Sequence, residues 1–176
     1  MSRLPDPDTV PMTAEERASF DRRGGQSGGP SAVWRWVPEI AKPAGALVLQ
    51  LRNGSLDRGA YRVMCLVVAR TWSSEHLFSV HMKGALADGV APDAIEAIRT
   101  RRVPAFEYAE QRIAYELTTE LLATHELLAA TYERAVAVLG LEHTIELVTG
   151  IGVYGTIGAL LRAFDVPVPE ADRVLG

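Results

Sequence analysis

The sequence predicts an all-α protein, and three observations support this prediction. Apolar residues recur at helical spacing along most of the chain. Proline, glycine and capping residues divide the chain into segments of helical length. No segment shows sustained alternation of apolar and polar residues, which is the pattern of a half-buried strand. We therefore expect a bundle of helices around one core.

Length and composition indicate a single globular domain. The chain has 176 residues, of which 48% are hydrophobic and 23% are charged, enough to bury a sizeable core. The formal net charge of -4 provides no basic field that would attract nucleic acid or an anionic membrane. We expect an extended N-terminal arm with a short helix over residues 1–30 and a helical domain over residues 31–176.

Cysteine use and hydropathy predict a soluble, cytoplasmic protein. The only cysteine, Cys65, lies in an apolar run, so no internal disulfide can form and the residue is typical of a core. The first residues contain prolines and acids where a signal peptide needs an apolar run. The uncharged stretch from Leu147 to Leu161 is shorter than the roughly 20 residues that span a membrane. We expect no membrane partner.

The N-terminal arm contains one predicted helix. Thr13-Ala-Glu-Glu16 is a capping-box pattern, which predicts a short polar helix to about Arg23. The glycine-rich segment Gly24–Pro30 follows as a flexible connector.

Proline and glycine mark most helix boundaries in the domain. Pro38, Pro92 and Pro104 each suit the first position of a helix. Gly54 and Gly140 suit helix ends, and Ser55 or Asp57 can cap a helix that is nearly apolar all round in its second half and should be central. The expected helices are a turn at 32–37, then 38–52, about 57–72, about 74–89, one beginning at Pro92, 104–125, 126–139 and 141–164.

The helix after Trp72 contains the first candidate catalytic group. Ser73 or Ser74 can cap it, Glu75 lies in its first turn, and Gly89 can close it in the left-handed conformation. His81 lies on the helical face that it shares with small and apolar residues. Burial and a nearby carboxylate move the pKa of a histidine in opposite directions, so this position can tune a catalytic imidazole.

Two other motifs do not predict a cofactor or a metal. The pattern Gly150-Ile-Gly-Val-Tyr-Gly155 satisfies G-x-G-x-x-G, but no strand precedes it, so a smooth strip for close helix packing is the better interpretation. His143 with Glu146 offers two ligands, whereas zinc needs three or four. We therefore expect neither a cofactor nor a metal.

Two stretches resemble the carboxymuconolactone decarboxylase and AhpD-like (alkylhydroperoxidase-D-like) family. The first runs from Arg62 to His81 and continues through Gly84-Ala and Gly89-Val-Ala-Pro-Asp-Ala-Ile-Glu96. The second runs from Glu146 to Pro169, and the likeness covers roughly residues 35–169. The resemblance implies an AhpD-like helical bundle, assembly into homotrimers or hexamers, and active sites near subunit contacts.

The resemblance also implies candidate site residues and two activities. His81 matches the family histidine, Glu75 the acid at the helix start, and Arg62 stands near a position where many members have a glutamate. The decarboxylase branch implies a cofactor-independent lyase for a small carboxylated lactone or cyclic acid, with His81 as general acid or base, Glu75 tuning it and Arg62 binding a carboxylate. The peroxidase branch has C-x-x-C where this chain has Ser74 and Leu77, which supply no thiolate.

A third hypothesis is a helical oligomer that binds a small ligand without catalysis. Aromatic residues could line its pocket, although aromatic residues at helical spacing usually belong to a core. These residues are Trp34, Trp36, Trp72 and Tyr154.

Overall fold

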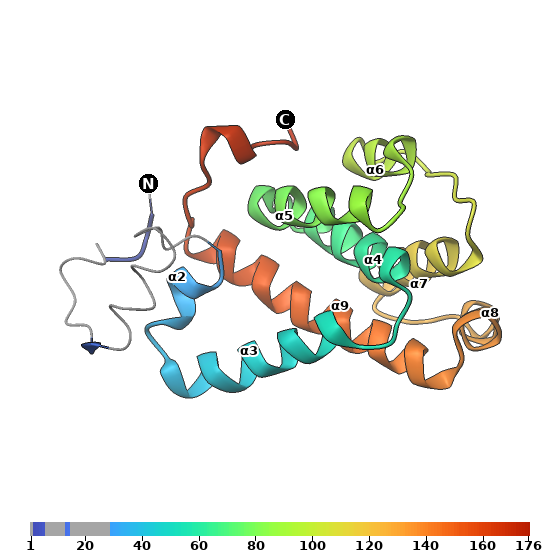
Figure 1. Ribbon diagram of the computed structural model, residues 1–176, viewed down its shortest axis with the longest axis horizontal. Coiled ribbons are helices and arrows are strands. Elements are labelled where there is room, and N and C mark those ends of the chain that lie inside the picture. The colour runs from blue at the N-terminus through green and yellow to red at the C-terminus, as the bar shows by residue number, and fades with distance from the viewer. Residues whose placement is uncertain (1, 6–12, 15–28) are drawn as a thin grey trace.

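The computed structural model describes residues 2–5, 13–14 and 29–176, and the regular elements of these residues are all helices (Figure 1). This confirms the all-α prediction. The elements are α2 (Ser31–Trp34), α3 (Pro38–Asn53), α4 (Arg58–Thr71), α5 (Glu75–Ala87), α6 (Pro92–Arg99), α7 (Ala109–Thr124), α8 (Ala129–Leu139), α9 (Leu141–Ala163) and a short 3-10 turn, η2 (Glu170–Asp172).

Helix α4 is the centre of the bundle. It packs against α5, α6, α7 and α9, and every residue from Val63 to Ala69 is buried. An apolar surface on all sides is stable only when other elements cover all sides, so the prediction of a central helix is confirmed. Asp57 is the cap of this helix, because its Oδ1 accepts a hydrogen bond from the Ala60 amide at 2.8 Å.

Glycines on α9 allow it to pack closely on α4. A Cβ atom at Gly150 would lie 2.6 Å from the Met64 methyl carbon, and one at Gly158 would lie 2.7 Å from the Trp72 ring. The glycine strip is thus a surface for close helix packing within the monomer, as predicted. It lies inside a helix rather than in a phosphate-binding loop.

Helix α9 is long and apolar enough to cross a membrane by length and composition alone. It has 23 residues and a mean hydropathy of 1.5, and 44% of its most apolar stretch is buried inside the protein. Its buried residues pack mainly against α4, which is the behaviour of a core helix.

Two predicted helix starts are wrong. Residues 101–108 form a loop, so α7 begins at Ala109 and not at Pro104. Pro104 and Phe106 are buried and Arg112 donates to the Phe106 carbonyl at 2.9 Å, so packing of the loop overrides the proline signal. Helix α8 begins at Ala129 rather than Glu126, because the Glu120 carboxylate accepts a hydrogen bond from the Leu128 amide just before it.

The expected side-chain cap of α5 is also absent. Ser74 occupies the N-cap position but makes no side-chain cap bond. Ser73 has φ 46°, and its hydroxyl accepts a hydrogen bond from Arg70 instead of from a helix amide. Gly89 has φ 81°, which confirms the predicted left-handed end. The predicted helix over residues 13–23 lies almost wholly outside the described residues.

Candidate active site

His81 lies where α4, α5 and α9 meet. Its side chain is only 5% exposed. The imidazole packs edge-on against the ring of Tyr154 on α9, with ring centres 5.0 Å apart, and lies 6.1 Å from the ring of Tyr61 on α4. Leu77, Phe78 and Ala85 on the same helix are buried as well. The apolar surroundings predicted for His81 are therefore present.

The structure brings Arg62 and His81 together. The Nη1 atom of Arg62 lies 3.3 Å from Nδ1 of His81. The Nε atom of the same guanidinium donates to Oδ2 of Asp88, at the end of α5, at 2.7 Å. Arg62, on α4, thus links His81 to a carboxylate at the end of α5. The Arg62 side chain is 17% exposed.

Gly84 makes room for this guanidinium. It lies one turn before Asp88 on α5, and a Cβ atom there would be 2.3 Å from the guanidinium carbon of Arg62. Any larger side chain would displace Arg62 from its position between His81 and Asp88.

His81 is electrically neutral in this environment. Burial lowers its pKa most, and the positive charge of Arg62 lowers it further, to about 3. His76, Arg52 and Arg58 act in the same direction. An imidazolium that donates a proton at neutral pH is therefore not the resting form of this residue.

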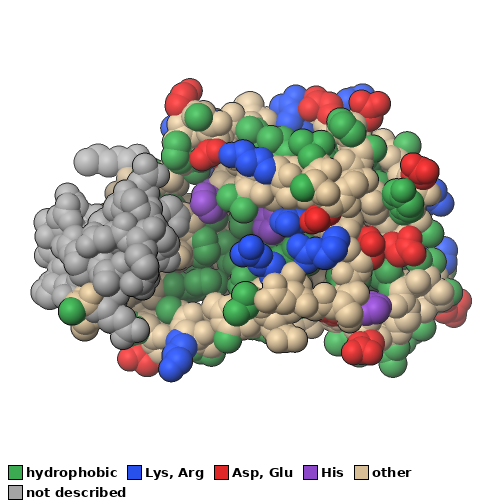
Figure 2. Space-filling view, viewed as in Figure 1, with side chains coloured by type: hydrophobic (Ala, Val, Ile, Leu, Met, Phe, Trp, Pro, Cys, Tyr) green, Lys and Arg blue, Asp and Glu red, His purple; other side chains and the backbone are tan. Residues whose placement is uncertain are grey.

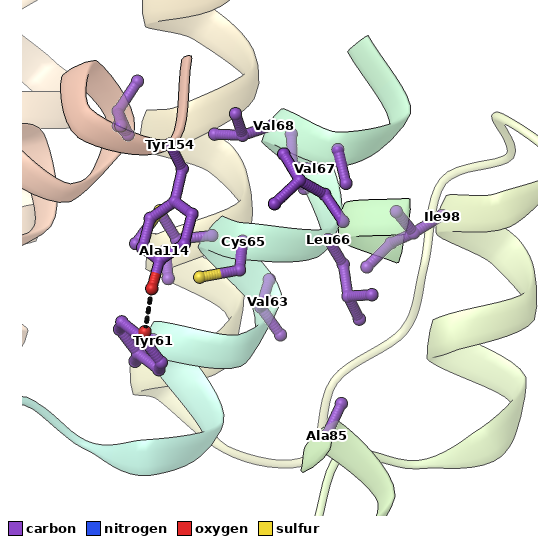
Figure 3. Close-up of a cluster of buried hydrophobic side chains, with 14 of the residues drawn as sticks. Tyr61, Val63, Cys65, Leu66, Val67, Val68, Ala85, Ile98, Ala114 and Tyr154 are labelled. Carbon is purple, nitrogen blue, oxygen red and sulfur yellow. Dashed lines mark hydrogen bonds between the residues drawn. The ribbon is translucent and has the colours of Figure 1, made fainter. Parts of the chain in front are cut away.

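Two tyrosines and the cysteine form a buried cluster (Figure 3), and both tyrosine rings lie beside His81. The hydroxyls of Tyr61 and Tyr154 hydrogen-bond to each other, and the Cys65 thiol interacts with both. Burial raises the pKa of Tyr154 to about 12 and raises the pKa values of Tyr61 and Cys65 as well. All three groups are protonated at neutral pH, so Cys65 is a thiol and not a thiolate.

A hollow opens between α3 and α5, with an apolar floor and with basic and histidine side chains beside it (Figure 2). Arg52 at the end of α3 and Arg58 at the start of α4 both act on the charge of His81. Arg58 donates to the Arg52 carbonyl at 2.5 Å and lies 3.7 Å from Asp88. Three arginines therefore act on this region, and two of them, Arg58 and Arg62, share the carboxylate of Asp88, so the region attracts anions.

Glu75 has different partners from the other two predicted site residues. Its Oε2 accepts hydrogen bonds from the amides of Val174 and Leu175, at 2.7 and 2.9 Å, and so holds the C-terminal segment on α5. No contact with His81 or Arg62 is found for it in the described part of the chain. The position of Glu75 fits a structural tie better than the tuning of His81.

Four residues near His81 were not predicted from the sequence to belong to the site: Tyr61, Arg58, Arg52 and Asp88. Arg58, Arg62 and Cys65 are spaced three or four residues apart, so they lie on one face of α4, and this periodicity was an available signal. Of the aromatic residues expected to line a pocket, Tyr154 is in the site, whereas Trp72 packs on Gly158. Within the described ranges, no group of three or more potential ligands is placed to hold a metal ion.

Comparison with known proteins shows the fold of this chain. No family model and no curated protein matches the sequence. The structure is similar to a crystal structure from Agrobacterium tumefaciens of a protein of unknown function, described as a proposed AhpD antioxidant defence protein. The TM-score is 0.67 at 18% sequence identity, and the match covers 77% of this chain and 96% of that chain. The fold is therefore AhpD-like.

Proposed function

We propose that this protein is a cofactor-independent carboxy-lyase for a small cyclic acid, such as a carboxylated lactone, bound in the hollow between α3 and α5. The observation that carries the proposal is the buried contact between Arg62 and His81, with Arg52 and Arg58 beside it. An arginine-rich and partly buried site suits a carboxylate ligand, because guanidinium groups bind carboxylates in a planar, bidentate manner.

The reaction requires an electron sink and a proton. When the bond to the carboxylate carbon breaks, carbon dioxide leaves and the electron pair passes into the conjugated carbonyl of the substrate. The negative charge that develops on the carbonyl oxygen needs a hydrogen-bond donor, and the carbon then takes a proton from the solvent or from a protein group. Neutral His81 is the proposed donor to that oxygen, while the arginines hold the acid group of the substrate.

A carbon dioxide release assay on candidate carboxylated lactones tests the proposal. His81→Asn, which keeps a polar side chain of similar length, should lower turnover by at least about a hundredfold. His125→Asn is the matched control, because His125 is exposed at the end of α7. Turnover that is equal in the two variants would remove His81 from the mechanism. Binding of these ligands without any turnover would favour a helical oligomer that only binds a small ligand.

Hydroperoxide reduction is the second candidate, because the similar structure is described as an antioxidant defence protein. Disulfide exchange needs a thiolate and a second thiol, whereas Cys65 is the only cysteine and burial raises its pKa. We therefore expect no hydroperoxide consumption with a thiol reductant. Consumption that disappears in Cys65→Ser would replace the lyase proposal with a one-cysteine redox mechanism.

We further propose that the protein forms homo-oligomers, as trimers or hexamers, in the cytoplasm. Helix α3 exposes large apolar side chains, and Ile40 and Leu47 lie seven residues apart on one stripe of it. Leu47→Asp should lower the mass measured by light scattering, whereas Glu39→Gln, at the exposed start of the same helix, should not. A monomeric wild-type protein would contradict this proposal.

A further inference from the structure

Three side chains form a continuous chain from α5 to α4 and back to α5. Asp88 accepts a hydrogen bond from Arg62 Nε at 2.7 Å, and Arg62 Nη1 lies 3.3 Å from His81 Nδ1. Asp88 itself is about two helical turns from His81, so it acts on the imidazole only through Arg62.

We propose that Asp88 is a positioning residue, which by holding Arg62 fixes His81 as a neutral imidazole with its proton on Nε2, and so makes His81 a hydrogen-bond donor toward the ligand. The consequence for catalysis rests on the lyase proposed above, whereas the tautomer itself does not.

The chemistry of arginine fixes the direction of the bond. A guanidinium group has five N–H donors and no acceptor, so Nδ1 of His81 must be the acceptor in this contact. A neutral imidazole has one proton, which must then be on Nε2. No partner for Nε2 is found among the residues that the structure describes.

Asp88 and Gly84 determine where the guanidinium lies. The carboxylate of Asp88 binds one edge of the guanidinium, and the missing side chain of Gly84 provides the space for it. Long arginine side chains have many rotamers, and without an anchor this one, at 17% exposed, has a route to solvent. Loss of Asp88 should therefore release Nδ1 of His81.

The positive groups around His81 act in one direction, toward a neutral imidazole, and the carboxylate of Asp88, which is paired with Arg58 and Arg62, has the opposite charge. The titratable and charged groups near the ring come from each helix packed on it. These groups are Arg52 on α3, Arg58, Tyr61, Arg62 and Cys65 on α4, His76 and Asp88 on α5, and Tyr154 on α9. A net positive surrounding disfavours an imidazolium, and by the same Coulombic effect it strengthens Nε2–H as a donor to developing negative charge.

Nuclear magnetic resonance of 15N-histidine-labelled protein tests the proposal directly. The chain has four histidines, and His81→Asn assigns the signal of His81. In the wild type, we expect the Nε2–H tautomer alone and no titration of His81 between pH 8 and pH 4.5. In Asp88→Ala, we expect a mixture of tautomers and a His81 titration that moves upward into this window. Asp93→Ala, at the exposed start of α6, should match the wild type.

The opposite results would overturn the proposal. These results are an Nδ1–H tautomer in the wild type, or a His81 signal in folded Asp88→Ala that is identical to that of the wild type. Circular dichroism shows whether Asp88→Ala folds, and Asp88→Asn, which keeps an oxygen acceptor for Arg62, should give an intermediate tautomer ratio if the larger change is not tolerated. Asp88→Glu should recover part of the wild-type tautomer preference.

The same variants separate this proposal from the proposed function. If lyase turnover is found, Asp88→Ala should lower kcat more than it raises KM, because the donor to the developing oxyanion is misplaced while Arg52 and Arg58 still bind the acid. A protein with the Nε2–H tautomer but no lyase turnover would overturn the proposed function and leave the role of Asp88 standing.

Discussion

Helices α3 and α4 are neighbours of similar length and have opposite environments. In α4, ten of 14 residues are buried, whereas in the 16 residues of α3 only Leu51 is buried. Helix α4 contacts four other helices, and α3 contacts α9 and α2 at the edge of the bundle (Figure 1). Both helices contain a long apolar stretch, so hydropathy alone does not distinguish a core helix from an outlying one.

The two helices therefore contribute to the candidate site in different ways. The packed half of α4 provides a rigid frame, and its first turns contribute Tyr61 and Arg62, which lie against His81. Helix α3 contributes only Arg52 from its last turn. Groups fixed by α4 can hold a ligand in a defined geometry, whereas α3 supplies charge and an exposed apolar surface.

Truncation of a large side chain in each helix should give the largest difference in the free energy of unfolding. Leu66→Ala in α4 should lower the free energy of unfolding by about 2–5 kcal/mol, because it leaves a cavity in a fully buried position. Leu49→Ala in α3, where the side chain is exposed, should change it by less than about 0.5 kcal/mol in the monomer. Denaturant unfolding of both variants measures the difference. Equal losses would show that α3 is buried in an assembly.

Substitutions where α9 packs closely on the end of α4 should have the next largest effect on stability. Gly158→Leu should cost about 1–3 kcal/mol, because its side chain would overlap the Trp72 ring. Gly152→Leu on the same helix has open space at its Cβ position and serves as the control. A shift in Trp fluorescence together with thermal unfolding would report the displacement. No difference between the two variants would contradict the described packing of Trp72.

Acidification should destabilise the protein through His81. Its pKa is about 3 in the folded protein and near 6.5 when unfolded, so the unfolded chain binds more protons in this interval. Stability from this group is complete above pH 6.5 and is lost as the pH falls, by up to about 1.4 kcal/mol per pH unit. His81→Asn should flatten the dependence of unfolding free energy on pH between 6.5 and 4.5. An unchanged slope would place the ring in a more solvated site.

Loss of the N-cap of α4 should have the smallest effect on stability of the four changes described. Asp57→Ala should cost about 1 kcal/mol, because the Ala60 amide loses its acceptor. Asp57→Ser, which can accept the same bond, should recover most of the loss. Helix α3 has Val37 at its N-cap position and no side-chain cap, so its start is a natural site for a stabilising Val37→Asp. Thermal unfolding measures each change.

Local signals in the sequence predicted much of the fold. Pro38 and Pro92 begin helices where expected, because proline at a first position fits the backbone without losing a hydrogen bond. Pro104 failed as a signal because its burial in a loop depends on residues elsewhere in the chain. Helix starts are local, whereas loop packing is a tertiary property.

The candidate site was less predictable for the same reason. His81 was identified from its helical face, and its burial is as expected. The contact between Arg62 and Asp88 joins residues 26 positions apart, and that between Tyr61 and Tyr154 joins residues 93 apart. Periodicity within one helix does not determine such pairs. Burial, the largest cause of the lowered pKa of His81, follows from that face, whereas the further effect of the arginines on other helices could not be predicted from the sequence.

The missing side chain at position 84 has a consequence for how this protein can diverge. The volume beside Gly84 is filled by the end of the Arg62 side chain, so the two positions share a fixed space. We expect covariation in related chains: a larger residue at position 84 should accompany a shorter one at position 62, and an arginine there should require glycine. A substitution at only one of the two positions would leave the space overfilled or empty, so we expect the two positions to change together.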